Sequence, residues 1–63
     1  MSLKEIKNDL VSEAELLLYQ MKIARQKTDY AMINLKAESL TNICRKLELI
    51  RQEEERIHKE LNL

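Results

Sequence analysis

The sequence predicts an all-α fold built from long amphipathic helices, and three observations support this prediction. The 63 residues include no glycine and no proline, although an average chain of this length would hold roughly seven or eight of them. Hairpin strands and tight turns commonly require glycine and proline, so a β or mixed fold is not expected. Most of the chain consists of strong helix formers, and its apolar residues recur at helical spacing.

The chain is too short to bury a large core of its own. Below about 70–80 residues, one core rarely supplies more than about 3–5 kcal/mol. Because the chain has one cysteine, no intrachain disulfide adds to this stability. We therefore expect residues 1–63 to form a single helical coiled-coil module whose apolar surface is covered by a second chain.

The first predicted helix covers residues 2–26. Ser2 and Glu5 have the spacing of a capping box, in which the Ser2 hydroxyl accepts a hydrogen bond from the Glu5 amide. Apolar residues then follow steps of three and four, which places them on one face of the helix. That face contains Leu3, Ile6, Leu10, Ala14, Leu17, Met21 and Ala24.

The second predicted helix covers residues 30–62. Its apolar positions follow a heptad, which predicts a coiled-coil seam; they are Leu40, Ile43, Leu47, Ile50, Ile57 and Leu61. Glu54 interrupts this seam, where a carboxylate costs stability unless it is paired or reaches water. We expect Glu54 either to set the register or oligomeric state or to mark the point where the seam opens. Charged pairs four residues apart support the exposed face: Arg51–Glu55, Glu55–Lys59 and Arg56–Glu60.

The two apolar faces are out of phase, so a feature between Ala24 and Leu40 must absorb the offset. One solution is a helical hairpin with a turn at residues 27–29, where Asp29 tolerates the left-handed conformation and Thr28 or Asp29 caps the next helix. The other is one kinked continuous helix whose repeat shifts. The absence of glycine, the usual helix terminator, favours the continuous helix. We nevertheless favour the hairpin.

Two segments are apolar on every side of the helix, residues 16–19 and 30–33. Such a helix needs cover from more than one direction, and Leu and Ile alternate at the seam in an order that favours assemblies larger than dimers. We therefore expect a coiled coil or four-helix-type bundle, from dimer to tetramer. The predicted protein interface comprises Leu3, Ile6, Leu10, Leu17, Met21, Ile33, Leu40, Ile43, Leu47, Ile50, Glu54, Ile57 and Leu61.

Charge is balanced overall, with eleven basic and eleven acidic residues, but it is distributed unevenly. Both ends of the sequence are acidic, and the middle is basic through Lys22, Arg25, Lys27, Lys36, Arg45 and Lys46. A basic face of this kind permits weak nucleic-acid binding. However, the chain has neither an arginine-rich run nor neighbouring aromatic side chains on which bases would stack. These charges are better explained by solvation or by pairing with the acidic ends of a neighbouring chain.

The sequence supplies no catalytic constellation of acid, base and nucleophile, so we expect no enzymatic activity. It also predicts no cofactor and no metal site, because a single histidine, His58, with Glu54 four residues earlier is a poor ligand set. Cys44 is expected to be a buried or half-buried structural thiol. Tyr19 and Tyr30 are expected at the edge of a bundle, with their hydroxyls in water.

The expected function is that of a structural scaffold or interaction module, which oligomerises through coiled-coil packing or docks a helical protein partner. One alternative is a small regulator or chaperone that sequesters a partner helix in a groove, and another is a weak nucleic-acid binder. No signal peptide and no apolar run of membrane-spanning length are evident. We therefore expect an intracellular, cytoplasmic protein.

Overall fold

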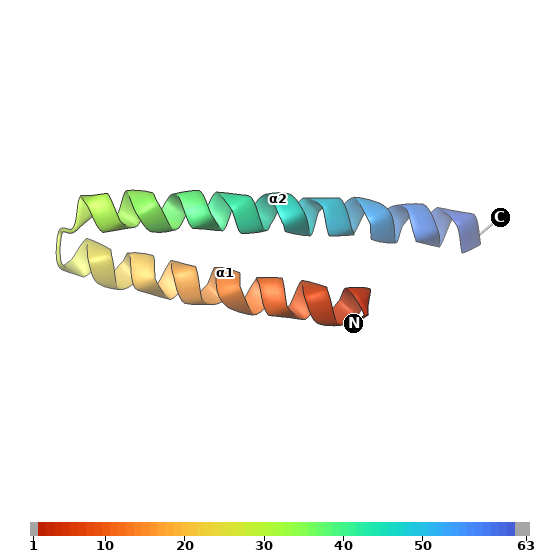
Figure 1. Ribbon diagram of the computed structural model, residues 1–63, viewed down its shortest axis with the longest axis horizontal. Helices are drawn as coiled ribbons and strands as arrows, with labels where there is room; N and C mark the ends of the chain where they lie inside the picture. Colours follow the sequence, from red (N-terminus) through yellow and green to blue (C-terminus); the bar gives the residue numbers. More distant parts are fainter. Residues whose placement is uncertain (1, 62–63) are drawn as a thin grey trace.

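The computed structural model describes residues 2–61 and shows an antiparallel helical hairpin (Figure 1). Helix α1 spans Leu3–Gln26 and helix α2 spans Tyr30–Leu61. The longest dimension of the molecule is 53 Å, whereas a continuous helix would extend about 90 Å at 1.5 Å per residue. The all-α prediction and the hairpin are therefore confirmed, and the alternative of one kinked continuous helix is wrong. Residue 62, the predicted end of the second helix, lies outside the described residues.

Helix α1 begins at the predicted cap. Ser2 has extended backbone angles (φ −80°, ψ 159°), and its hydroxyl accepts a hydrogen bond from the amide of Glu5 at 3.2 Å. Glu5 also places negative charge in the first turn, and Arg25 places positive charge in the last turn. Both charges interact favourably with the helix dipole, so the sequence of α1 supports a helix with these ends.

The turn between the helices is a Schellman motif. After Lys27, the amide of Thr28 donates to the carbonyl of Arg25 at 3.0 Å, and the amide of Asp29 donates to the carbonyl of Ala24 at 2.8 Å. These two bonds satisfy carbonyls that the end of α1 would otherwise leave unpaired. The chain therefore reverses its direction between the two helices within three residues, so that the two apolar faces can pack against each other despite their offset in sequence.

Threonine occupies the turn position at which glycine is usual. Thr28 has a φ of +54°, a left-handed conformation that costs a residue with a Cβ atom roughly 1–2 kcal/mol. Its hydroxyl donates to the carbonyl of Lys27 at 2.6 Å. Asp29 caps α2 instead, because its carboxylate accepts from the amide of Met32 at 3.1 Å. The cap on Asp29 agrees with the sequence analysis, whereas the left-handed residue is Thr28 and not Asp29.

The core of the hairpin is thin. Among the described residues only Ala24 and Ile43 are buried, with 4% and 8% of their surface exposed. Ala24 lies next to the turn, where a small side chain lets the two helices approach closely. Several apolar side chains along the two helices are only partly covered, among them Leu10, Ala14, Leu17, Met21, Ile33, Leu40, Leu47 and Ile50.

Helix α2 extends beyond α1 at the end opposite the turn (Figure 1). It has 32 residues and α1 has 24, a difference of eight residues, or about 12 Å of helix. The last turns of α2 therefore have little or no neighbouring helix in the hairpin. We call this end, where Leu3 and Leu61 lie, the open end.

Candidate protein interface

Both sides of the hairpin expose apolar side chains next to the seam. On one side a shallow hollow is lined by Gln20, Ile23, Ala24, Lys27, Asp29, Met32 and Lys36. Leu16 precedes Gln20 by four residues, so it lies on the side of α1 that borders this hollow. Leu35 follows Met32 by three residues, so it lies on the side of α2 that borders the hollow. We call this surface the Leu16 flank.

The opposite side has a second hollow, lined by Leu18, Met21, Lys22, Arg25 and Ile33. Val11 precedes Leu18 by seven residues and therefore lies on the same side of α1. We call this surface the Leu18 flank. Leu16 and Leu18 are almost equally accessible, with 56% and 54% of their surface exposed.

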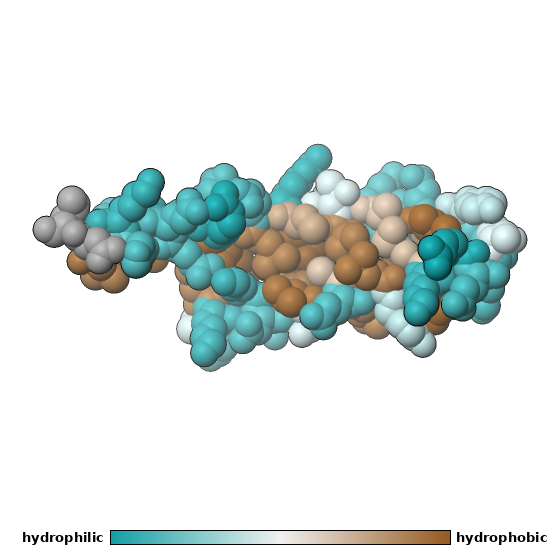
Figure 2. Space-filling model, turned by 180° about the vertical axis from the view of Figure 1, so that it is seen from behind, coloured by the Kyte–Doolittle hydropathy of each residue, from teal (hydrophilic) through white to brown (hydrophobic). Residues whose placement is uncertain are grey.

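The exposed apolar surface is extensive for so small a molecule. Twelve large hydrophobic residues of the described chain are classed as exposed: Leu3, Ile6, Val11, Leu16, Leu18, Tyr19, Tyr30, Met32, Leu35, Leu49, Ile57 and Leu61. On the face seen in Figure 2, hydrophobic side chains form a continuous band over both helices, with polar side chains at its edges. Large contiguous patches of this kind mark interaction sites in soluble proteins.

The predicted interface residues divide into two groups in the hairpin. Those nearer the turn, together with the middle of α2, are buried or partly covered in the hairpin: Leu10, Leu17, Met21, Ile33, Leu40, Ile43, Leu47 and Ile50. The rest are exposed and lie toward the open end: Leu3, Ile6, Glu54, Ile57 and Leu61. Eight of the thirteen predicted residues are thus at least partly covered within one chain, and the two flanks beside them add exposed apolar side chains that the prediction did not include.

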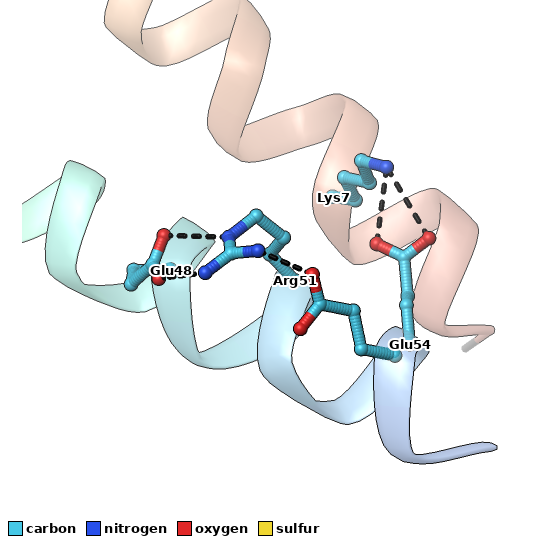
Figure 3. A network of polar contacts seen from close by, with 5 residues as sticks. Lys7, Glu48, Arg51 and Glu54 are labelled. Atoms are coloured by element: carbon cyan, nitrogen blue, oxygen red, sulfur yellow. Dashed lines mark hydrogen bonds and ion pairs between the residues drawn. The ribbon is translucent and has the colours of Figure 1, made fainter. Parts of the chain in front are cut away.

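Glu54 forms an ion pair with Lys7 of α1. The Lys7 Nζ atom lies 3.0 Å from one carboxylate oxygen of Glu54 and 3.3 Å from the other, and both side chains are nearly half exposed (Figure 3). Such accessible pairs are worth roughly 0.2–1 kcal/mol. Glu54 also lines a hollow with Leu3, Lys4, Lys7 and Asn8, so the seam is open at this level. Sequence reasoning missed Lys7 because it lies 47 residues away.

Two arginines of α2 each bridge two glutamates. Arg51 donates two hydrogen bonds to Glu48 and one to Glu55 (Figure 3). Arg56 does the same with Glu53 and Glu60, donating to Glu60 at 2.7 Å. The bonds to Glu55 and Glu60 have the four-residue spacing predicted from the sequence, and the bonds to Glu48 and Glu53 add a three-residue spacing.

These ion pairs change the acidity of the carboxyl groups. The hydrogen bonds from Arg51 lower the pKa of Glu48 below its ordinary value of 4.5. The hydrogen bonds from Arg56 lower the pKa of Glu53 in the same way. Both glutamates therefore take up a proton at a lower pH than a glutamate without such a partner.

Cys44 is exposed, so the expectation of a buried or half-buried thiol is wrong. It follows Ile43 by one residue, which is 100° around the helix and so beyond the edge of the two-helix seam. A third helix would be needed to cover it. Tyr19 and Tyr30 are largely exposed as well.

The basic residues of the middle segment do not share one face. Lys27 and Lys36 line the hollow of the Leu16 flank, and Lys22 and Arg25 line the hollow of the Leu18 flank. Arg45 lies on a further side of α2 with Glu38, Thr41 and Asn42. The fold thus disperses the charges that a nucleic-acid backbone would need on one continuous surface.

Within residues 2–61, no group of three or more histidine, cysteine or acidic side chains is arranged to hold a metal ion. His58 lies beside Lys7, Arg51 and Glu54 at the open end. Neither helix, as far as the structure describes it, is long and apolar enough to cross a membrane. No protein-family model, no curated protein and no solved structure matches this chain.

Proposed function

We propose that this hairpin is an interaction module, which buries its exposed flanks against further helices, either in an oligomer or on a docked helical partner. One observation carries the proposal: two residues are buried in the described chain, whereas twelve large hydrophobic residues are exposed. This excess of exposed over buried apolar residues supports the role of a helical scaffold, because the hairpin has a small core and a large apolar surface that other helices can cover.

Energetics supports the same proposal. Fixing the backbone of each residue costs roughly 1–2 kcal/mol, and burial of apolar surface must offset that cost at about 25 cal/mol per Å². A hairpin whose described residues include only two buried ones, Ala24 and Ile43, obtains little of this benefit alone. Cover on the Leu16 flank or the Leu18 flank would supply the missing burial.

The second form of the proposal, a regulator or chaperone that sequesters a partner helix, uses the same two flanks. It differs in its behaviour without a partner. A self-assembling hairpin forms a stable oligomer in isolation. A hairpin that binds a different protein is instead a loosely packed monomer when it is alone, and it becomes ordered when the partner helix binds.

The direct test is the molecular mass of the isolated chain by size-exclusion chromatography with light scattering, together with thermal unfolding followed by circular dichroism over a hundredfold range of concentration. We expect an oligomer whose melting temperature rises with protein concentration. A well-folded monomer with a melting temperature independent of concentration, which also fails to bind any amphipathic helical peptide, would overturn the proposal.

A matched pair of variants locates the surface that associates. Replacing Leu16 and Leu18 together by glutamine removes the exposed apolar residues at the centre of both flanks and should lower the mass or the melting temperature. Tyr19→Gln is the control, because Tyr19 lies two residues from both Leu17 and Met21 and so points away from the seam. If the control perturbs association as much as the double variant, the flanks are not the interface.

A further inference from the structure

We infer that the Leu16 flank is covered by a second copy of this chain, lying end over end, so that the two turns point in opposite directions and each turn lies beside the middle of α1 of the other copy. The inference rests on the proposed function and deepens it by naming the partner, the face and the orientation. Two hairpins packed in this way form a four-helix bundle with a two-fold axis perpendicular to the helices.

The Leu16 flank carries more exposed aliphatic side chains than the Leu18 flank. Its exposed large hydrophobic residues are Leu16, Met32 and Leu35. Leu49, also exposed, follows Leu35 by fourteen residues and extends the same side of α2 toward the open end. The Leu18 flank offers Val11 and Leu18, together with Tyr30, which precedes Ile33 by three residues. A partner that covers the Leu16 flank therefore buries more aliphatic surface.

The α1 edge of this flank is complementary to itself when it is reversed. The residues along this edge are spaced three or four apart, and they are Glu13, Leu16, Gln20, Ile23 and Lys27. Their side chains are, in this order, acidic, apolar, polar, apolar and basic. An antiparallel copy centred on Gln20 places Leu16 beside Ile23 of the second copy. It also places each Glu13 beside the other copy's Lys27, and the two Gln20 amides beside each other. Because the contact is isologous, each favourable pair occurs twice.

The charges at the two ends of the hairpin favour the same orientation. Residues 22–37, around the turn, carry four basic side chains and one acidic side chain, a net charge of +3. At the open end, residues 2–15 have a net charge of −2, and residues 47–61 also have −2. Two copies with their turns together would bring like charges into contact, which disfavours that arrangement. The end-over-end arrangement separates the two basic turns and moves each one toward the acidic segments of the other copy.

The area needed is available. A standard stable interface buries about 800 Å² on each partner, and the hairpin exposes 5239 Å². The second copy would therefore need to cover about 15% of the surface of the first.

The orientation is tested by distances between spin labels in a background of Cys44→Ser, with one label on each chain so that only distances between copies are measured. Asn8→Cys lies twelve residues from Gln20, so the end-over-end dimer separates the two labels by about 36 Å along the helix axis. A dimer with its turns together brings them within roughly 20–25 Å, the width of a bundle with axes 8–10 Å apart plus the labels. Tyr19→Cys, near the centre, is the control and gives a short distance in both arrangements.

Charge reversal tests the pairing itself. Lys27→Glu should weaken self-association by about five- to tenfold, because two ion pairs become repulsive in each dimer. Lys22→Glu makes the same charge change on the Leu18 flank and should have a smaller effect. Mixing the Lys27→Glu chain with a Glu13→Lys chain should restore association as a heterodimer, since every contact is then again between opposite charges. Circular dichroism of each variant verifies that it remains helical.

The outcomes separate this inference from the proposed function. An oligomer whose Asn8→Cys labels lie close together, or whose association responds equally to Lys22→Glu and Lys27→Glu, would overturn the orientation and leave the interaction module standing. A chain that is monomeric at all concentrations and binds a helical peptide on the Leu16 flank would overturn the second copy as the occupant. The long distance together with rescue by mixing would establish the inference.

Discussion

The two ends of the hairpin are held by different forces. Near the turn, Ala24 is buried and backbone hydrogen bonds close the Schellman motif. At the open end, the helices meet through the exposed ion pair of Lys7 and Glu54, and the rest of α2 is supported by links from Arg51 and Arg56 to neighbouring glutamates. The turn is therefore held by apolar packing and backbone hydrogen bonds, and the described interactions of the open end include solvent-exposed ion pairs.

This difference shows how a chain without a large core can keep two long helices. Packing fixes the helices only over the part where both are present, and the longer helix continues under its own local interactions. Pairs spaced three or four residues apart stabilise an isolated helix without any tertiary neighbour. Each end should therefore respond to its own kind of perturbation, and the following experiments separate them in order of expected effect.

The largest effect is expected from the seam. Ile43→Ala removes most of the buried side chain at the centre of α2 and should lower the free energy of unfolding by about 2–4 kcal/mol, measured by urea denaturation at fixed protein concentration. Leu61→Ala is the control, because 80% of Leu61 is exposed, and it should change the free energy of unfolding by less than about 0.5 kcal/mol. Equal effects of the two variants would show that packing does not distinguish the seam from the open end.

A gain of stability is expected at the turn. Thr28→Gly removes the Cβ atom from a residue with a φ of +54° and should raise the free energy of unfolding by about 1 kcal/mol. Thr28→Ala keeps the Cβ atom and loses only the hydroxyl bond to Lys27, so it should be no more stable than the parent chain. If glycine destabilises the hairpin, the side-chain bond outweighs the backbone cost.

A smaller change is expected at Glu54. Glu54→Leu completes the heptad and should raise the free energy of unfolding by up to about 1 kcal/mol, because an exposed ion pair is worth little. It should also extend the apolar seam to the open end, where a change of oligomeric state would appear in light scattering. Glu54→Gln removes the charge without adding apolar surface and should be slightly destabilising. The expectation is wrong if the leucine variant is less stable than the glutamine variant.

The smallest effect is expected from acid, and it should be confined to the end of α2. The pKa values of Glu48 and Glu53 are lowered in the folded chain, so their contribution to stability is present above pH 4.5, the ordinary value, and is lost as the pH falls through the lowered values. Amide hydrogen exchange of residues 48–61 should accelerate there before exchange near Ile43 does. In Arg56→Gln the pKa of Glu53 should return toward its ordinary value, as followed by carboxyl carbon chemical shifts.

The sequence was sufficient to predict the helices, because heptad spacing and the Ser2 cap act within a few residues. For the turn at residues 27–29, the offset between the two apolar faces favoured the hairpin but did not exclude one kinked continuous helix. The left-handed residue was harder to assign, since neither glycine nor asparagine occupies the turn and Thr28 takes that conformation against its own preference.

The features that depend on contacts between the helices could not be predicted with the same accuracy. Pairing of Glu54 with Lys7 requires the relative register of two helices over 47 residues, and a small change in supercoiling would select another lysine. Exposure of Cys44 depends on how many helices surround α2, which periodicity alone does not specify. The interface prediction followed the seam for the same reason and stays a prediction, and it left out the exposed apolar side chains of the two flanks.

The single short turn also determines the order in which contacts are expected to form during folding. Along the hairpin, the contacting residues become steadily more distant in sequence, from five residues for the Asp29–Ala24 bond to 47 for the Lys7–Glu54 pair. Closing a longer loop costs more entropy, so the helices should associate first at the turn and then progressively toward the open end. Substitutions near Thr28 should therefore change the folding rate, whereas substitutions near Glu54 should act mainly on the unfolding rate.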